Sequence, residues 1–321
     1  MQPMEVTSGD DDNNAVSLST AERKKRSRNF AILGLAAACV VIGLWTKYFG
    51  GNGEAAIETG GSALSPSSPQ VVPPSPDLPK MPIITTRSSY TLIEELPHDK
   101  RSFTQGLLYS PKTKKVYESA GLYGQSYVRE FDHNSGDVVR KSSKLERKFF
   151  AEGIVEDADG DLIMLTWKEK TALRITTDDF TTKSTFNYKT HTSEGWGITN
   201  YGDDFIVSDG SAWIFLWDGA TMEEKRRFQV HTSDGKKVRF LNELEYYKGD
   251  ILANIWYSDI IVRIDVESGI VKTIYDFKDL WPKKDRDVNA DCFNGIALLE
   301  DDVLLVTGKL WPKAYKIKLN I

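Results

Sequence analysis

Carboxyl, amide and indole groups recur at one equivalent position of a repeated pattern in this sequence. The pattern occurs five times, with marker residues at Gly106, Gly153, Gly197, Leu244 and Gly295, which follow one another at intervals of 44 to 51 residues. The residues directly before these markers are Gln105, Glu152, Trp196, Glu243 and Asn294. Such a set packs poorly as a core. It is suited to a pocket that binds a small polar ligand and fixes its orientation through a few placed groups.

Neighbouring positions add aromatic walls and a cation. Phe103, Phe150 and Asn242 lie within three residues before a marker. The ends of the second apolar segments of the second, fourth and fifth copies add Trp167, Trp256 and Lys309. Each residue also has a purely structural interpretation: the tryptophans as packing, Glu152 as the partner of a nearby Arg or Lys, and Lys309 as a solvated turn residue. The recurrence of tryptophan near one end of successive copies favours the pocket.

The segments of each copy are typical of β-strands. Apolar runs alternate with turns such as Asp159-Gly160 and Gly249-Asp250, which suit hairpins. Four antiparallel strands in about 45 residues, repeated, make a β-propeller blade. We therefore predict an all-β, five-bladed β-propeller over residues 88–321, in which residues 88–96 supply the outermost strand of the fifth blade and close the ring. A β-sandwich with accidental similarity between its strands is the alternative.

At these residues the sequence resembles the glutaminyl-peptide cyclotransferases (glutaminyl cyclases) of the plant and bacterial type. The resemblance covers nearly all of residues 90–321 and rests on long motifs in a fixed order. These motifs are FTQGLLY, YESAGLYGQSYVREFD, AEGI, LTWKE, GWGIT, SDGS, LNELEY, ANIW, NGIA and VTGKLWPKAY. The family fold is a five-bladed propeller, in agreement with the number of repeats.

The resemblance implies conversion of an N-terminal glutamine of peptides or proteins to pyroglutamate with release of ammonia. It identifies Glu152 in FAEG as the catalytic carboxyl group, which would take a proton from the α-amine and return it to the leaving nitrogen. Asn242 in LNELEY and Lys309 in TGKLWP match the other polar catalytic positions, and either could hydrogen-bond the developing oxyanion. The substrate-binding walls would be Phe103, Gln105, Phe150, Trp167, Trp196 and Trp256.

This interpretation requires no metal or other cofactor, although the propeller channel leaves room for a structural ion. Neither the four histidines nor the two cysteines show a short metal-ligand spacing. Two other classes stay open. One is a membrane-tethered propeller that binds a partner without chemistry, and the other is a metal-dependent propeller lactonase. In the lactonase a calcium ion would be surrounded by Gln105, Glu152, Glu243 and Asn294.

The N-terminal 87 residues differ in composition from the rest. Residues 1–29 are polar, end in five closely spaced basic residues, and predict a disordered cytosolic tail. Residues 30–49 carry Lys47 as their only charge and can cross a bilayer as one transmembrane helix. Residues 50–87 hold seven of the twelve prolines and predict an extended stalk.

The basic residues before the apolar segment indicate how the chain would be oriented in a membrane. By the positive-inside rule they place the propeller on the lumenal side, as in a single-pass type II signal-anchor protein of the secretory pathway, of the ER or Golgi type. A cleaved signal peptide is the alternative.

Charge and cysteine content limit the partners further. With 41 Lys and Arg against 46 Asp and Glu, the chain has no basic surplus for binding phosphates, which excludes nucleic acid. Cys39 falls in the predicted membrane helix and Cys292 stands alone in the propeller, so no disulfide is expected there. We expect a monomer whose partners are peptides with an N-terminal glutamine and, through residues 30–49, the membrane.

Overall fold

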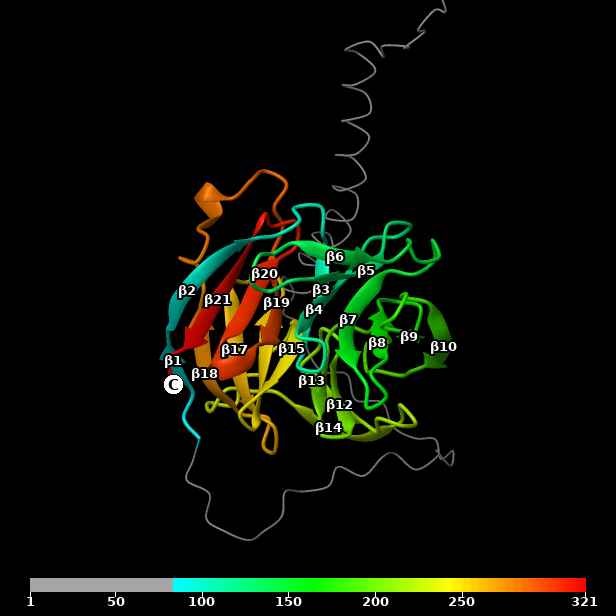
Figure 1. Cartoon of the computed structure of the whole chain (residues 1–321). Helices are drawn as coiled ribbons and strands as arrows, with labels where there is room; N and C mark the ends of the chain where they lie inside the picture. The colour runs from blue at the N-terminus through cyan, green and yellow to red at the C-terminus, as the bar shows by residue number, and fades with distance from the viewer. Residues whose placement is uncertain (1–82) are drawn as a thin grey trace, which may run out of the picture. The chain divides into compact units, whose positions relative to one another are not determined.

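The computed structural model describes residues 83–321, which fold into five sheets (Figure 1). Each sheet contains four antiparallel strands, and one carries an added parallel strand. The prediction of an all-β, five-bladed propeller is confirmed. The predicted tail, the predicted membrane helix and nearly all of the predicted stalk lie outside the described residues. Within residues 83–321 no helix has the length and hydropathy to cross a membrane.

The first three blades follow the chain from inner to outer strand. Blade 1 contains β3 (Thr104–Ser110), β4 (Lys115–Ala120), β5 (Tyr127–Phe131) and β6 (Val138–Lys141). Blade 2 contains β7 (Ala151–Glu156), β8 (Leu162–Thr166), β9 (Thr171–Ile175) and β10 (Thr182–Asn187). Blade 3 contains β11 (Ile198–Tyr201), β12 (Asp204–Ser208), β13 (Trp213–Trp217) and β14 (Glu224–Gln229).

The last two blades each take a strand from the N-terminal part of the domain. Blade 4 contains β15 (Leu241–Tyr247), β16 (Asp250–Ile255), β17 (Ile260–Asp265) and β18 (Val271–Asp276), with β1 (Thr86–Ser88) parallel to β18. Blade 5 contains β19 (Phe293–Leu298), β20 (Leu304–Gly308), β21 (Lys313–Leu319) and β2 (Tyr90–Pro97). Two short 3₁₀ turns, Lys283–Asp285 and Glu300–Asp302, lie beside blade 5.

Strand β2 closes the ring. It runs antiparallel to β21, with Tyr90 opposite Leu319 and Leu96 opposite Ala314, and the two strands lie side by side in Figure 1. The expected closure by residues 88–96 is therefore confirmed, with a shift of one or two residues. The pairing of β1 with blade 4 has no counterpart in the sequence prediction. Together β1 and β2 connect blade 4 to blade 5.

Apolar side chains fill the space between neighbouring blades. The described residues form five hydrophobic clusters, and each cluster combines residues of two adjacent blades. The cluster between blades 5 and 1, for example, contains Leu107 and Phe131 together with Leu305 and Ala314. Sheets that pack face to face around an axis in this way bury both faces of every blade, which makes the ring rigid.

Three of the four marker glycines, Gly106, Gly153 and Gly197, are points where neighbouring inner strands approach very closely. A Cβ on Gly106 would lie 2.8 Å from the Cα of Gly153, and a Cβ on Gly153 would lie 2.9 Å from the Cα of Gly197. On Gly197 a Cβ would lie 2.1 Å from the carbonyl oxygen of Asn242. Real Cβ atoms do not tolerate such distances from backbone, so a side chain there would push the inner strands apart. The repeat is therefore visible in the sequence because ring packing requires these small residues.

Candidate functional site

All nine predicted site residues lie at one end of the ring. Phe103 and Phe150 directly precede the inner strands β3 and β7, and Trp196 lies two residues before β11. The second residues of the inner strands β3, β7 and β15 are Gln105, Glu152 and Asn242. One residue after the second strands β8, β16 and β20 come Trp167, Trp256 and Lys309. Because adjacent strands are antiparallel, the start of a first strand and the end of a second strand meet at the same edge of a blade.

An irregularity of the inner strands turns their polar residues toward the axis. In blades 1, 2, 4 and 5 the pairing between first and second strand shifts in the segment that ends at the marker residue or includes it. In blade 3 the Trp196 N–H and the Gly197 carbonyl both bond to the backbone of Ser208. Such β-bulges re-aim a side chain out of the regular alternation of a strand. The bulged segments contain Gln105, Glu152, Trp196, Asn242, Glu243 and Asn294.

Glu152 is the buried carboxyl group of the site. Its side chain is 4 % exposed, and its Oε1 accepts a hydrogen bond of 2.9 Å from Nε2 of Gln105. Burial raises the pKa of Glu152 well above its ordinary value, the charge of Lys309 opposes this rise, and the carboxylates of Glu194 and Glu169 add to it. A raised pKa makes the carboxylate a stronger base than that of an ordinary glutamate, which suits a group that accepts and returns a proton.

Lys309 contributes a buried ammonium group. The residue is 3 % exposed, and its Nζ lies 4.9 Å from the centroid of the Phe103 ring. Backbone bonds of 2.9 Å from Lys309 N to Cys292 O and from Asp291 N to Lys309 O hold the main chain. Within residues 83–321 the ammonium group forms no ion pair. A buried cation without a carboxylate partner is costly, so this amine is poised to bind an oxygen of a ligand.

Asn242 is buried beside the inner strand of blade 3. It is 2 % exposed, its carbonyl oxygen accepts a 2.6 Å bond from Ser208 Oγ, and its Oδ1 has no partner among the described residues. Gln105 Oε1 is likewise buried and without a partner. Unsatisfied polar atoms of this kind are rare in native interiors and need an explanation. Both residues lie at the same end of the ring, where a polar ligand would satisfy their free oxygens.

The aromatic residues form two connected walls. In the first wall the ring centroids of Phe103 and Phe150 are 6.2 Å apart and those of Phe150 and Trp167 are 5.5 Å apart. In the second wall Trp196 meets Trp256 edge to face at 5.4 Å. Edge-to-face contacts of this kind add to the burial energy of the rings. These rings present rigid apolar surfaces at the end of the ring that carries Glu152, Asn242 and Lys309, and we call this end of the ring, with its nine site residues, the chamber.

Three residues that the sequence reasoning did not assign also belong to the site. Glu194 accepts hydrogen bonds from both Trp167 Nε1 and Trp196 Nε1. Tyr123 packs on Phe150 at 5.2 Å between ring centroids, and its hydroxyl donates a 2.8 Å bond to Glu169. The motifs GWGIT and LTWKE, which border or contain the two glutamates, were the available signal.

Two residues of the polar ring hold the propeller together. Glu243 accepts bonds from the N–H groups of Leu107 at 3.2 Å and Ile296 at 2.7 Å, one to each carboxylate oxygen. Nδ2 of Asn294 donates to the carbonyl oxygen of Thr104 at 3.1 Å. Glu243 therefore links blade 4 to blades 1 and 5. In the described part of the chain no cluster of three or more His, Cys, Asp or Glu side chains is arranged to hold a metal.

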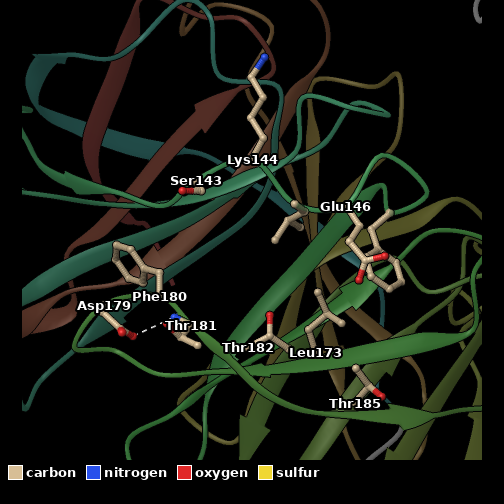
Figure 2. A pocket seen from close by; sticks show the side chains of 11 residues that line it. Ser143, Lys144, Glu146, Leu173, Asp179, Phe180, Thr181, Thr182 and Thr185 are labelled. Atoms are coloured by element: carbon tan, nitrogen blue, oxygen red, sulfur yellow. Dashed lines mark hydrogen bonds between the residues drawn. The ribbon is translucent and has the colours of Figure 1, made fainter.

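A separate pocket of about 310 Å³ lies toward the outer edge of blades 1 and 2 (Figure 2). Its lining includes Lys144, Phe149, Phe180 and Thr185, and none of the nine predicted site residues. Thr181 N donates a 2.9 Å bond to Asp179 Oδ1 in its wall. The carboxylates in its lining, Glu146 and Asp179, are exposed, whereas the end of the ring holds the buried Glu152 and is therefore the better candidate site.

Fold and side chains together define a five-bladed propeller with a buried carboxyl group, a buried amine and aromatic rings at one end of its ring. The sequence model of the glutamine cyclotransferase family matches residues 71–319. The chain belongs to this family, which confirms the resemblance seen in its motifs.

Two similar proteins illustrate the relationship. The glutaminyl-peptide cyclotransferase of Arabidopsis thaliana is 36% identical over 236 residues, which are 71% of each chain. The crystal structure of Myxococcus xanthus glutaminyl cyclase is 28% identical, with a TM-score of 0.64 over 74% of this chain and 98% of that one.

Proposed function

We propose that the chamber closes the N-terminal glutamine of a peptide or protein to pyroglutamate and releases ammonia, with Glu152 as the proton-transfer group. The observation that carries the proposal is the buried Glu152 carboxyl group, whose pKa is raised by burial in a chamber that also holds Lys309. The family match supports the reaction.

The proton balance of the reaction fits one carboxylate. The α-nitrogen attacks the γ-carbonyl carbon, a new carbon–nitrogen bond forms, and the carbon–nitrogen bond of the carboxamide breaks. Glu152 accepts the proton that the α-nitrogen loses and returns it to the departing nitrogen, which leaves as ammonia. A free α-amino group has a pKa of about 7.7–8.0. The raised pKa of Glu152 makes its carboxylate a better acceptor for the amine proton than an ordinary glutamate would be.

Lys309 and Asn242 are suited to the negative charge that develops on the γ-oxygen. A buried ammonium group without an ion pair interacts strongly with an oxyanion in a chamber that excludes water. Gln105 holds Glu152 through its Nε2. The aromatic walls restrict the glutamine side chain to conformers in which the carbonyl carbon is near the amine, which reduces the entropic cost of ring closure.

Ammonia release tests the proposed reaction against the two other classes. We expect a Gln-initiated peptide to release ammonia and to lose 17 mass units, and we expect a chelator to leave the rate unchanged. An otherwise identical peptide that begins with Asn is the control, since its ring would be strained. A partner-binding propeller would release no ammonia, and a calcium-dependent enzyme would stop when the chelator is added.

We also propose that the propeller is monomeric and is held on the lumenal side of a secretory-pathway membrane by residues 30–49. The apolar stretch and the basic residues before it support this orientation. In sealed microsomes, added protease should leave residues 83–321 intact until detergent is present. Digestion without detergent would place the propeller in the cytosol instead.

A further inference from the structure

One carboxylate oxygen connects the two aromatic walls. Oε2 of Glu194 accepts a 2.8 Å bond from the indole N–H of Trp167 and a 2.9 Å bond from the indole N–H of Trp196. Trp167 follows the second strand of blade 2, whereas Trp196 precedes the first strand of blade 3. We propose that Glu194 is a positioning residue that fixes these two indole rings as walls of the substrate chamber. The inference rests on the proposed function.

The backbone around Glu194 is held from both blades. Gly195 N donates a 2.9 Å bond to Trp167 O in blade 2, and Trp196 N donates a 3.0 Å bond to Ser208 O in blade 3. Thr190 Oγ1 donates a 2.7 Å bond to the Glu194 carbonyl oxygen. Because the main chain is fixed, only the side-chain torsions of Glu194 must be ordered for its carboxylate to reach both indoles. Hydrogen bonds to a charged acceptor are stronger than neutral ones.

A surface ion pair does not account for the position of this side chain. Lys168 is the cation that the structure places beside Glu194, and its Nζ lies 3.8 Å from Oε1, the other carboxylate oxygen. The lysine side chain is 52% exposed, and an exposed ion pair at this distance contributes little. The two indole bonds are shorter and converge on a single oxygen, which is the arrangement expected of a residue that orients aromatic rings.

Glu194 also influences the proton-transfer group through its charge. Its carboxylate and that of Glu169 raise the pKa of Glu152, while Lys309 lowers it. The neutral amide of Gln105 bonds to the Glu152 carboxyl group, and the hydroxyls of Tyr123 and Tyr188 are also close enough to interact with its charge. Orientation and charge can be separated by substitution, because glutamine keeps an oxygen acceptor for both indoles but carries no charge.

The experiment compares E194Q and E194A in the full-length protein, with E169Q as the charge-matched control. Ammonia release from a Gln-initiated peptide is measured from pH 5 to 9, and near-ultraviolet circular dichroism reports the packing of the indoles. We expect E194A to lower kcat/KM by about 10- to 100-fold, mainly through KM, because displaced walls misplace the substrate. Its near-ultraviolet spectrum should change.

For E194Q we expect a KM within about threefold of wild type and an unchanged near-ultraviolet spectrum. The acid limb of its kcat/KM profile should move to lower pH, because the loss of a negative charge lowers the pKa of Glu152. E169Q should move that limb in the same direction without altering the indole signal.

Each outcome bears on a different claim. Wild-type protein that releases no ammonia contradicts the proposed function. Active wild type together with an E194A variant of normal KM and normal near-ultraviolet spectrum overturns the positioning role alone. If E194A does not fold, E194Q still decides: a large rise in its KM with an unchanged near-ultraviolet spectrum would overturn the positioning role, because substrate binding would then depend on the charge and not on the orientation of the indoles.

Discussion

Glu152→Gln is expected to lower kcat/KM for a Gln-initiated peptide by about 10²- to 10⁴-fold, the usual contribution of a positioned acid–base group. The amide has nearly the volume of the carboxyl group and still offers an oxygen to Gln105 Nε2, which now bonds to Glu152 Oε1 at 2.9 Å. It cannot accept and return a proton. The decrease in kcat/KM should therefore come from a slower chemical step, with KM changed little. Single-turnover ammonia release would show it directly.

The same variant should be no less stable than wild type, and more stable at high pH. The pKa of Glu152 is raised in the folded chain. The stability that its proton contributes is thus complete below the unfolded-state pKa and is lost as pH rises through the folded-state pKa. Glutamine has no such dependence. Urea unfolding at pH 5 and pH 9 should show a gain for E152Q that grows with pH, and wild-type turnover in this variant would remove Glu152 from the mechanism.

Lys309→Met should produce the second large effect. The methionine fills similar space beside Phe103 but cannot bind an oxyanion, so we expect kcat/KM to fall by about 10²- to 10³-fold. Because the charge of Lys309 holds the pKa of Glu152 down, its removal should move the acid limb of the profile to higher pH. This shift of the acid limb is opposite in direction to the shift expected for E194Q and E169Q, in which a neighbouring carboxylate is neutralised.

A matched control for this variant is Lys313→Met. Lys313 lies in the same blade and pairs with Glu95 at 2.8 Å on the surface, so its loss should leave both the rate and the pH profile unchanged. An acid limb that stays in place in K309M, with the rate preserved, would show that the ammonium group does not act on Glu152 or on the substrate.

The propeller could be predicted because its packing requirement is local and repeats. Glycine is needed wherever two inner strands approach as closely as those at Gly153 and Gly197, so the blades carry a periodic signal. Closure of the ring by residues 88–96 could be predicted because the last repeat of the sequence lacks a fourth strand and these residues supply one. Strand β1 could not be predicted, because Thr86–Ser88 is a short, largely exposed segment without apolar alternation.

The site could be predicted as a set of residues but not in its individual contacts. Equivalent positions of a ring must converge, which brought Glu152 and Lys309 to one end. The repeat alone did not distinguish Glu152 from Glu243, and only the family resemblance singled out Glu152. In the structure Glu152 bonds to the Gln105 side chain, whereas Glu243 binds backbone N–H groups of two other blades. Their difference depends on the bulges and on inter-blade distances. The double hydrogen bond to Glu194 likewise depends on a loop that passes between two blades.

The pairing of β2 with β21 has a consequence for how the chain folds. Thr91 and Asn320, which are hydrogen-bonded at 3.0 Å, are 229 residues apart in the chain. A contact between such distant residues requires an unfavourable loop closure and forms slowly. During synthesis β2 emerges first and must wait for its partner. Until β21 arrives, an unpaired strand edge is open to association with other chains, so this step is where newly made protein is most exposed to misassembly.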